Sequence, residues 1–190
     1  FAIELTMSRS AAYITRIRQQ WVGKLTQIFI PLYSRIAADG ETPAISLKSH
    51  LADNPDNLPA LFDETRRRDE IVGHTSVGPH RDDIDLQIND MPVRRAASQG
   101  QCKTYTIALR LAQYEFLRLG VGMKPMLLLD DIFDKLDATR VERVVEIVSE
   151  EIFGQIFITD TNRAHLDNIM ERSANSHRSW QVDSGKFTLI

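Results

Sequence analysis

Apolar side chains recur at helical spacing in two stretches of the first half of the chain. In residues 1–30 they are three or four positions apart, which predicts a long helix with this stripe: Ile14, Ile17, Trp21, Leu25 and Ile28. Residues 59–71 form a second predicted helix, with Pro59 in its first turn and this apolar edge: Leu58, Leu61 and Phe62. Prolines between the two helices indicate loops, with a strand at Ile45-Ser46-Leu47.

Two further helices are predicted in the second half. One begins at Ser98 and ends near a Gly-Val-Gly stop, with this apolar stripe: Ala108, Leu111, Ala112, Phe116 and Leu119. Because Gln101 follows Ser98 by three residues, the pair has the sequence of a capping box and Ser98 is the expected N-cap. The other helix is expected at residues 138–152, with this apolar face: Val141, Val144, Val145, Val148 and Ile152.

Strands are predicted where the period of the pattern changes. Residues 84–88 alternate apolar and polar side chains, which is typical of a half-buried strand. Asn89-Asp90 then predicts a turn into Met91-Pro92-Val93, and the proline indicates that this returning strand is an edge. A second hairpin is expected within residues 180–190, turning at Asp183-Ser184-Gly185.

Two unbroken apolar runs predict buried strands: Met126-Leu127-Leu128-Leu129 and Ile156-Phe157-Ile158-Thr159. A helix separates them, so the strands should be parallel neighbours, and the fold class is α/β with a parallel βαβ core. The carboxyl ends of both strands then meet at one edge of the sheet. Polar residues follow each strand there: Asp130-Asp131 after the first and Asp160-Thr161-Asn162 after the second.

Asp130 and Asp131 indicate a magnesium site beside a reaction centre. Because side chains alternate along a strand, one carboxylate can hold Mg²⁺ while the other faces the reacting group. An apolar strand that ends in an acid is the Walker B pattern, the magnesium-holding part of nucleotide hydrolases. The alternative is a strand that ends in two solvated acids.

The helix start at Ser98 is a candidate phosphate site. Free N–H groups, a serine hydroxyl and the bare backbone of Gly100 favour an anion, although a helix cap and nothing more is the alternative. The stretch Gly100-Gln101-Cys102-Lys103-Thr104 resembles the end of a P-loop. That pattern requires glycine at two positions where the chain has Ala97 and Cys102, so we reject the match.

The amino-acid composition limits the class of protein and the cellular compartment that we expect. With 43% hydrophobic and 26% charged residues the chain is an ordinary globular protein, and no apolar run approaches the roughly 20 residues of a membrane span. One cysteine, Cys102, excludes an internal disulfide and favours a reducing, cytoplasmic setting. The formal net charge of −3 does not favour nucleic acid, yet residues 1–30 carry +3, either as a solvated face or as an arm along DNA phosphates.

Three motifs, in this order, resemble the RecF family of bacterial recombination mediators, which is related to SMC proteins: Gly78-Pro79-His80-Arg81-Asp82-Asp83, Ser98-Gln99-Gly100-Gln101 and Leu127-Leu128-Leu129-Asp130-Asp131. The resemblance is strong from Leu58 to Asp167 and fainter before Leu58. It implies the C-terminal part of an ABC-type ATPase head for residues 58–190. For residues 1–57 it implies part of the helical arm domain, lobe II.

The resemblance also implies a role for individual residues. The signature motif, which contacts the γ-phosphate of ATP bound to the other protomer, is matched by Ser98, Gln99, Gly100 and Gln101. Asp130 matches the Walker B acid that holds Mg²⁺, and Asp131 matches the acid that orients or deprotonates the attacking water. Asp137 falls in the D-loop, which crosses the dimer interface. Thr159-Asp160 matches the switch segment.

The chain departs from the family pattern at three places. Its D-loop has Asp134-Lys135-Leu136-Asp137 instead of Ser-Glu-Leu-Asp, which puts that interface contact in doubt. Asp160 stands where many such heads carry histidine, so no phosphate-sensing role is assigned to it. The chain opens at Phe1 inside a helix-forming stretch and shows no P-loop. We therefore expect that an N-terminal portion is missing and that the chain holds the trans half of an ATP site.

The function implied by the resemblance is a DNA-binding ATPase of recombinational repair, replication-fork maintenance and the SOS response. The implied cofactors are ATP and Mg²⁺, with slow DNA-dependent hydrolysis in the full-length protein and loading of recombinase at gaps. The implied partners are single-stranded and duplex DNA, gap junctions, an ATP-dependent homodimer, RecR and RecO, but no membrane. DNA contact is expected at the basic arm and near Arg94-Arg95. The alternatives are an SMC-like or nuclease-associated head and an interaction domain without nucleotide chemistry.

Overall fold

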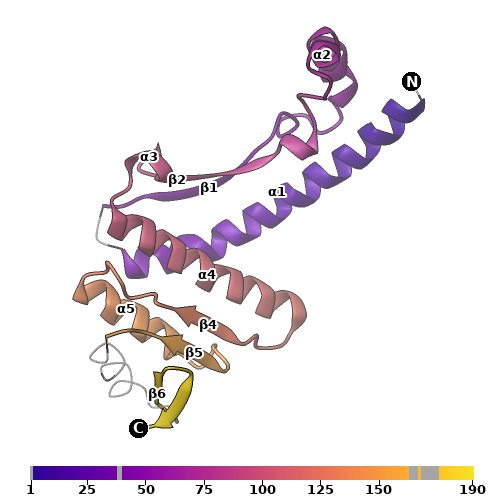
Figure 1. Ribbon diagram of the computed structural model, residues 1–190. Coiled ribbons are helices and arrows are strands. Elements are labelled where there is room, and N and C mark those ends of the chain that lie inside the picture. Colours follow the sequence, from indigo (N-terminus) through magenta and orange to yellow (C-terminus); the bar gives the residue numbers. More distant parts are fainter. Residues whose placement is uncertain (1, 38–39, 163–166, 168–175) are drawn as a thin grey trace.

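The computed structural model describes residues 2–37, 40–162, 167 and 176–190. Its helices are α1 (Ala2–Ile36), α2 (Leu58–Val72), α3 (Val93–Ala96), α4 (Gln99–Val121) and α5 (Ala138–Val148), with a 3₁₀ turn η1 (Pro79–Arg81). Its strands are β1 (Pro43–Lys48), β2 (Asp83–Ile88), β3 (Met91–Pro92), β4 (Leu127–Asp130), β5 (Ile156–Thr159), β6 (Trp180–Asp183) and β7 (Lys186–Leu189). Figure 1 shows an arm, made by α2 and the N-terminal half of α1, extending from layers that contain α4, α5 and the β4–β5 sheet.

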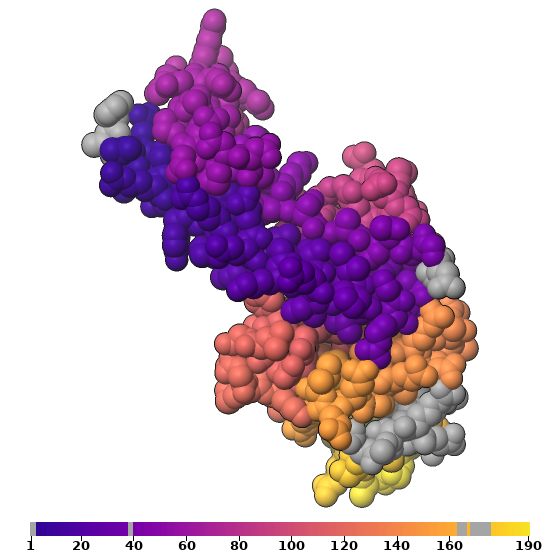
Figure 2. Space-filling model, turned by 180° about the vertical axis from the view of Figure 1, so that it is seen from behind, coloured from indigo at the N-terminus to yellow at the C-terminus, as the bar shows by residue number. Residues whose placement is uncertain are grey.

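The first helix is longer than predicted, because α1 continues through Pro31 to Ile36. A proline usually ends or kinks a helix. Here the last two turns are held by side chains that are buried in the main core: Phe29, Leu32, Tyr33 and Ile36. In Figure 2, α1 crosses the molecule from the arm to the segments of α4 and α5.

The predicted apolar stripe of α1 is wrong at Ile14 and Trp21, which lie on the exposed side; Trp21 is 59% exposed. The buried face in this half of the helix instead carries small residues: Ala11, Ala12 and Thr15. Ala11 belongs to a second apolar cluster with Leu58 of α2. Small residues allow close approach of the arm elements, so the partner rather than side-chain size decides which face is buried.

An ion pair connects the end of η1 to the helix α1. Arg18 of α1 donates a hydrogen bond from Nη1 to Asp82 Oδ2 at 2.6 Å and another to the Pro79 carbonyl oxygen. Gly78 enters this turn with φ of +121°, a backbone conformation that favours glycine. The Gly78–Asp83 motif therefore joins α1 to the start of β2.

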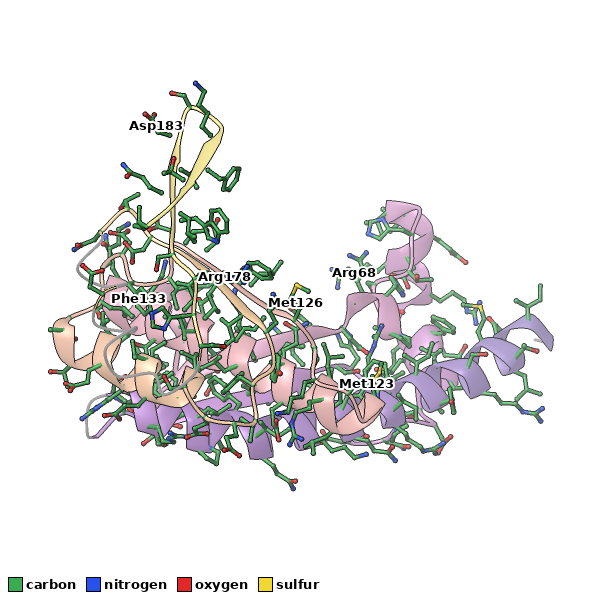
Figure 3. All side chains as sticks on the ribbon, turned by 90° about the horizontal axis from the view of Figure 1, so that it is seen from below. Arg68, Met123, Met126, Phe133, Arg178 and Asp183 are labelled. Carbon is green, nitrogen blue, oxygen red and sulfur yellow. The ribbon has the colours of Figure 1, made fainter. Side chains whose placement is uncertain are left out.

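The antiparallel sheet has the order β1-β2-β3, which confirms the predicted strand at residues 45–47 and the hairpin after β2. Asn89 and Asp90 turn with φ of +50° and +60°, the left-handed pair of a tight hairpin turn. Pro92 lies in the edge strand, as predicted, but Val93 does not, because the helix α3 begins there. A second predicted hairpin, β6–β7, is also confirmed, and Figure 3 shows it projecting from the molecule with Asp183 near its tip.

The βαβ unit is confirmed, because β4 and β5 are parallel neighbours with α5 between them in the chain. The prediction that both strands are fully buried is wrong within the described residues. Leu127 and Leu129 are buried, whereas Leu128 is 61% and Phe157 49% exposed, and Met126 is also exposed (Figure 3). Alternate side chains of a strand face opposite sides, and only one side of this sheet is packed. α5 also ends four residues early, at Val148.

α4 lies at the centre of the core and begins and ends where predicted, at a Ser98 cap and a left-handed Gly122. Tyr105 packs its ring 4.7 Å from that of Phe29, and its hydroxyl donates to the Ala44 carbonyl oxygen at 2.7 Å. Burial raises the pKa of the Tyr105 hydroxyl above its ordinary value. Leu119 is exposed, against prediction, because the last turns of α4 extend past the sheet.

The two apolar clusters do not divide at the expected domain boundary. The main cluster joins α1, α4, β4 and α5, and the smaller one joins the N-terminal half of α1 to α2. Each therefore contains residues from both sides of position 57, and the division into residues 1–57 and 58–190 stays a prediction.

None of the helices described here is at once long enough and apolar enough to span a membrane.

Candidate active site

The parallel strands end side by side and their polar residues touch. Asp130, the last residue of β4, pairs with Thr159, the last residue of β5. The Thr159 hydroxyl donates a hydrogen bond to Asp130 Oδ1, and the backbone N–H of Asp131 donates to the Thr159 carbonyl oxygen at 3.1 Å. Asp160 follows directly, and its carboxylate accepts from the Asn162 N–H at 2.6 Å. The predicted meeting of polar residues at this edge of the sheet is confirmed.

Asp131 leaves the sheet in a left-handed conformation, with φ of +46°. Strand alternation, the predicted reason for its direction, is wrong, because β4 ends at Asp130 and a turn aims Asp131 instead. Lys103 of α4 holds that turn by donating from Nζ to the Asp131 carbonyl oxygen at 2.8 Å. The Asp131 carboxylate is exposed and accepts no hydrogen bond from the residues that the structure describes. Aspartate is one of the few residues besides glycine that adopt this backbone readily, so the turn is compatible with the residue.

Asp130 fits a magnesium ion that is also bound by phosphate. One of its oxygens accepts from the Thr159 hydroxyl, and its side chain is otherwise exposed to solvent. Within the described ranges no three His, Cys, Asp or Glu side chains gather as a metal cage. Mg²⁺ commonly keeps several waters and uses only one or two carboxylates together with substrate phosphates, so a single acid suffices.

The predicted capping box at the start of α4 is present. Ser98 Oγ accepts from the Gln101 N–H at 3.2 Å, and Gln101 Oε1 accepts from the Ser98 N–H at 2.8 Å. This box fixes the first turn of the helix, where N–H groups that lack a helical partner create a positive end. Ser98 and Gln99 are exposed there, so an anion can approach this turn from solvent.

Gly100 faces the protein on one side. A Cβ atom at this position would lie 3.3 Å from Arg140 Nη1 and 3.6 Å from the Lys135 carbonyl oxygen. The sequence suggested that glycine keeps the backbone open to phosphate. The structure adds a second reason, because glycine also allows α4 to approach the loop before α5.

Asp137 is the N-cap of α5, a role that was not predicted although aspartate before a helix is the usual signal. Its Oδ1 accepts from the Arg140 N–H at 2.9 Å, and the side chain remains 61% exposed. Between the sheet and this cap, Ile132 and Phe133 are buried and anchor the loop in the core. Asp131 and Asp137 therefore lie at the two ends of a loop that the core keeps in position.

Sequence reasoning missed three residues that hold the site together. Lys103 lies in the stretch that does not match a P-loop, and no neighbour in sequence indicates its contact with the Asp131 turn. Arg140 follows Asp137 by three residues, a spacing that signals one helix face. Glu41, which binds Arg140, has no neighbours in sequence that indicate this role.

The candidate site as a whole combines the start of a helix, which favours an anion, with the exposed carboxylate of Asp131. Such an arrangement is suited to phosphate binding and to the activation of water.

No family model matches the chain. Among curated proteins, the DNA replication and repair protein RecF of Bacteroides fragilis (strain YCH46) is 43% identical over 182 residues, which make up 96% of this chain and 49% of that protein. RecF of Azobacteroides pseudotrichonymphae is also 43% identical, over 183 residues, with the same shares of 96% and 49%. The chain spans about half the length of the curated relatives that it matches.

Solved structures share the fold. One of the recombination mediator protein RecF with ATP, from the RecFOR pathway, has a TM-score of 0.72 at 22% identity and covers 98% of this chain and 49% of its own. Another, from work on ATP-driven dimerisation and DNA-stimulated activation of SMC ATPases, has a TM-score of 0.59 at 14% identity, covering 93% of this chain and 88% of its own. These likenesses confirm the predicted α/β fold.

Proposed function

Because the chain belongs to the RecF family and corresponds to the C-terminal half of its members, we propose that it forms the trans half of an ATP site in a DNA-repair ATPase. The observation that carries this proposal is the arrangement at the sheet edge. Asp130 and Asp131 lie against Thr159, and Lys103 connects their turn to the helix that Ser98 caps. The two carboxylates proposed to bind Mg²⁺ and water are thus connected, through Lys103, to the helix whose start is proposed to bind an anion.

In the proposed dimer, the first turn of α4 contacts the γ-phosphate of the ATP that is bound by the other protomer. The contacting residues would be Ser98, Gln99, Gly100 and Gln101. The positive end of the helix lowers the energy of the phosphate charge, and the capping box keeps the turn from rearranging when the protomers meet. Asp137, exposed at the start of α5, would cross the interface beside this turn.

Asp130 and Asp131 have separate proposed tasks. Asp130 would hold Mg²⁺ through water, and the ion would neutralise charge on the phosphates. Asp131 would orient the attacking water or accept its proton, since its carboxylate is exposed and forms no hydrogen bond with the described residues. The hydrogen bonds of the Asp131 backbone with Lys103 and Thr159 keep that carboxylate in place.

The open face of the β4–β5 sheet supports the proposal of a half-head. Leu128 and Phe157 are exposed on this face, although parallel sheets are normally covered on both faces. The relatives are about twice as long as this chain, and we propose that their other half covers the face and supplies the phosphate cradle. A complete nucleotide site would then need both halves.

Magnesium-ATP binding to the 190-residue chain tests the half-site directly. We expect isothermal calorimetry to detect no binding to this chain, while the full-length protein binds ATP under the same conditions. Circular dichroism on the same sample shows whether the chain is folded. Tight binding to the folded chain would contradict the half-site and would direct attention to residues 100–104.

The likeness to SMC heads keeps an SMC-like or nuclease-associated ATPase as the second candidate. Two observations favour the RecF type: the relatives at 43% identity and the higher TM-score, 0.72 against 0.59. For the intact protein we propose slow DNA-dependent ATP hydrolysis, dimerisation on DNA, loading of recombinase at gaps and a role in the SOS response. RecR and RecO as partners and a cytoplasmic location are part of the same proposal.

We propose that DNA contacts α3 rather than the arm. In the predicted basic arm, Arg16 pairs with Asp56 and Arg18 with Asp82, so half of its basic side chains are already neutralised. Arg94 and Arg95 are exposed on α3 and have no ion pair among the described residues. We propose that these two guanidinium groups bind DNA phosphates.

Replacing both α3 arginines tests this surface in the full-length protein. Arg94→Ala with Arg95→Ala should weaken DNA binding and reduce the slope of log affinity against log salt by about one to two. The matched control is Arg67→Ala with Arg68→Ala, which removes two consecutive exposed arginines from α2. Fluorescence anisotropy at several salt concentrations measures the slopes. Equal slopes for the α3 variant and the unchanged protein would contradict the assignment.

A further inference from the structure

Arg140 is an almost buried cation that contacts several parts of the candidate site. Its side chain is 12% exposed, and that of its partner Glu41 is 10% exposed. Nη2 donates to Glu41 Oε1 at 3.0 Å, and Nη1 donates to Thr104 Oγ1 at 3.1 Å. Nε lies 3.4 Å from Asp137 Oδ2. One planar guanidinium thus joins the loop before β1, the helix α4 and the cap of α5.

Glu41 connects this guanidinium to α1. Its second oxygen, Oε2, accepts a hydrogen bond from the hydroxyl of Tyr33. Tyr33 is fully buried and packs against Phe29 and Tyr105. Burial, together with the bond to Glu41, raises the pKa of the Tyr33 hydroxyl, so it stays a donor throughout the ordinary pH range. Each carboxylate oxygen of Glu41 therefore accepts a hydrogen bond, one from Tyr33 of α1 and the other from Arg140 of α5.

The guanidinium also lies against the first turn of α4. Nη1 would be 3.3 Å from a Cβ atom at Gly100, and Thr104, its hydrogen-bond partner, is one turn further along the same face. On its other side the group touches Asp137. It therefore spans the two segments that are proposed to meet the second protomer.

We propose that Arg140 is a positioning residue, which sets the spacing between Asp137 and the Ser98–Gln101 turn, and that Glu41 holds it in place from α1. This inference rests on the proposed function, since it concerns the geometry of the same trans site. The three nitrogens of an arginine lie in one rigid plane, so partners that bind all of them are fixed relative to each other. Two surface segments of one protomer must keep their spacing if both are to contact one partner.

A purely structural role predicts a different result. In that case Arg140→Lys would lower the free energy of unfolding, because buried partners of the guanidinium would lose a donor, and it would leave the dimer affinity of the folded protein unchanged. A positioning residue, in contrast, changes the affinity of the interface that it shapes while the fold persists. The two roles therefore separate when folding stability and dimerisation are measured on the same variant.

The variant Arg140→Lys in the full-length protein distinguishes the structural role from the positioning role. Lysine keeps a cation opposite Glu41, but its single ammonium group cannot reach Glu41, Thr104 and Asp137 together. We expect a lower melting temperature, because Thr104 or Asp137 loses its donor, but a protein that stays folded under the assay conditions and binds ATP as a monomer with unchanged affinity. The dissociation constant of the ATP-dependent dimer should rise about tenfold, which corresponds to about 1.4 kcal/mol. Analytical ultracentrifugation with ATP gives the dimer constant, and thermal melting gives the stability.

Arg143→Lys is the matched control. Arg143 is on the same helix and also ties it to α1, through hydrogen bonds from Nη1 to the carbonyl oxygens of Ile36 and Ala37. These bonds involve none of the proposed site residues. The control variant should dimerise like the unchanged protein. Equal weakening in both variants would show that α1–α5 packing, not the spacing at the site, sets dimer affinity, and would overturn the inference.

Asp137→Asn adds a test of coupling. If Arg140 acts through Asp137, the double variant should lose less dimer affinity than the two single losses combined, because both remove the same contact. Fully additive losses would contradict the inference. If the unchanged protein fails to dimerise with ATP, the proposed function fails first. If it does dimerise and Arg140→Lys matches it, only the positioning role is refuted.

Discussion

Asp131→Asn in the full-length protein is expected to reduce ATP turnover by about a hundredfold or more and to leave ATP binding and ATP-dependent dimerisation intact. An amide is nearly the same size as a carboxylate, but it cannot accept the proton of the attacking water. Asparagine also tolerates left-handed backbone, so the turn at φ of +46° should survive the change. The bonds from Lys103 and to Thr159 use backbone atoms of Asp131 and remain available.

Asp90→Asn is the matched control for that experiment. Asp90 is an exposed aspartate with φ of +60°, and it lies in the β2–β3 turn rather than at the edge of the parallel sheet. The chemical change and the backbone conformation are therefore the same, while the location differs. Phosphate release measures turnover, and ultracentrifugation with ATP measures dimerisation. Full turnover in the Asp131 variant would remove that residue from the proposed chemistry.

The start of α4 and the β2–β3 turn could be predicted because neighbours in sequence decide them, whereas the C-terminal ends of α1 and α5 could not. The Ser98 cap depends on Gln101, three residues away, and the turn at Asn89-Asp90 depends on residues that accept left-handed backbone. The buried faces were less predictable. Trp21 fits the helical stripe of α1 but is exposed, while Ala11 on another face meets α2. Burial depends on which distant segment arrives, and periodicity within one helix cannot specify it.

The candidate site shows the same division between local and distant information. Asp130 and Ser98 could be proposed from their positions at a strand end and a helix start. Arg140 and Glu41 are 99 residues apart, and their contact exists only after α1, α4 and α5 have packed together. Lys103 likewise reaches the Asp131 turn from another element. The sequence thus indicates the groups that could react, and the folded chain adds the groups that place them.

Ser98→Arg in the full-length protein is expected to weaken ATP-dependent dimerisation by about a hundredfold. The long side chain would fill the space in which the partner's phosphate meets the first turn of α4, and a hundredfold loss of affinity corresponds to about 2.7 kcal/mol. The hydroxyl that accepts from the Gln101 N–H is also lost, which costs about 1 kcal/mol of helix stability. ATP binding within one protomer should persist, because the proposed contact is made across the interface.

Ser98→Ala separates the lost cap from the blocked phosphate contact. Alanine removes the same hydroxyl but adds no bulk, so its melting temperature should fall about as far as that of Ser98→Arg, while ATP-dependent dimers still form with a loss of at most about tenfold. Ultracentrifugation of both variants with and without ATP gives the comparison. If the arginine variant dimerises as well as the alanine variant, the first turn of α4 does not face the partner's phosphate. The candidate site would then be reduced to the acids at the end of β4.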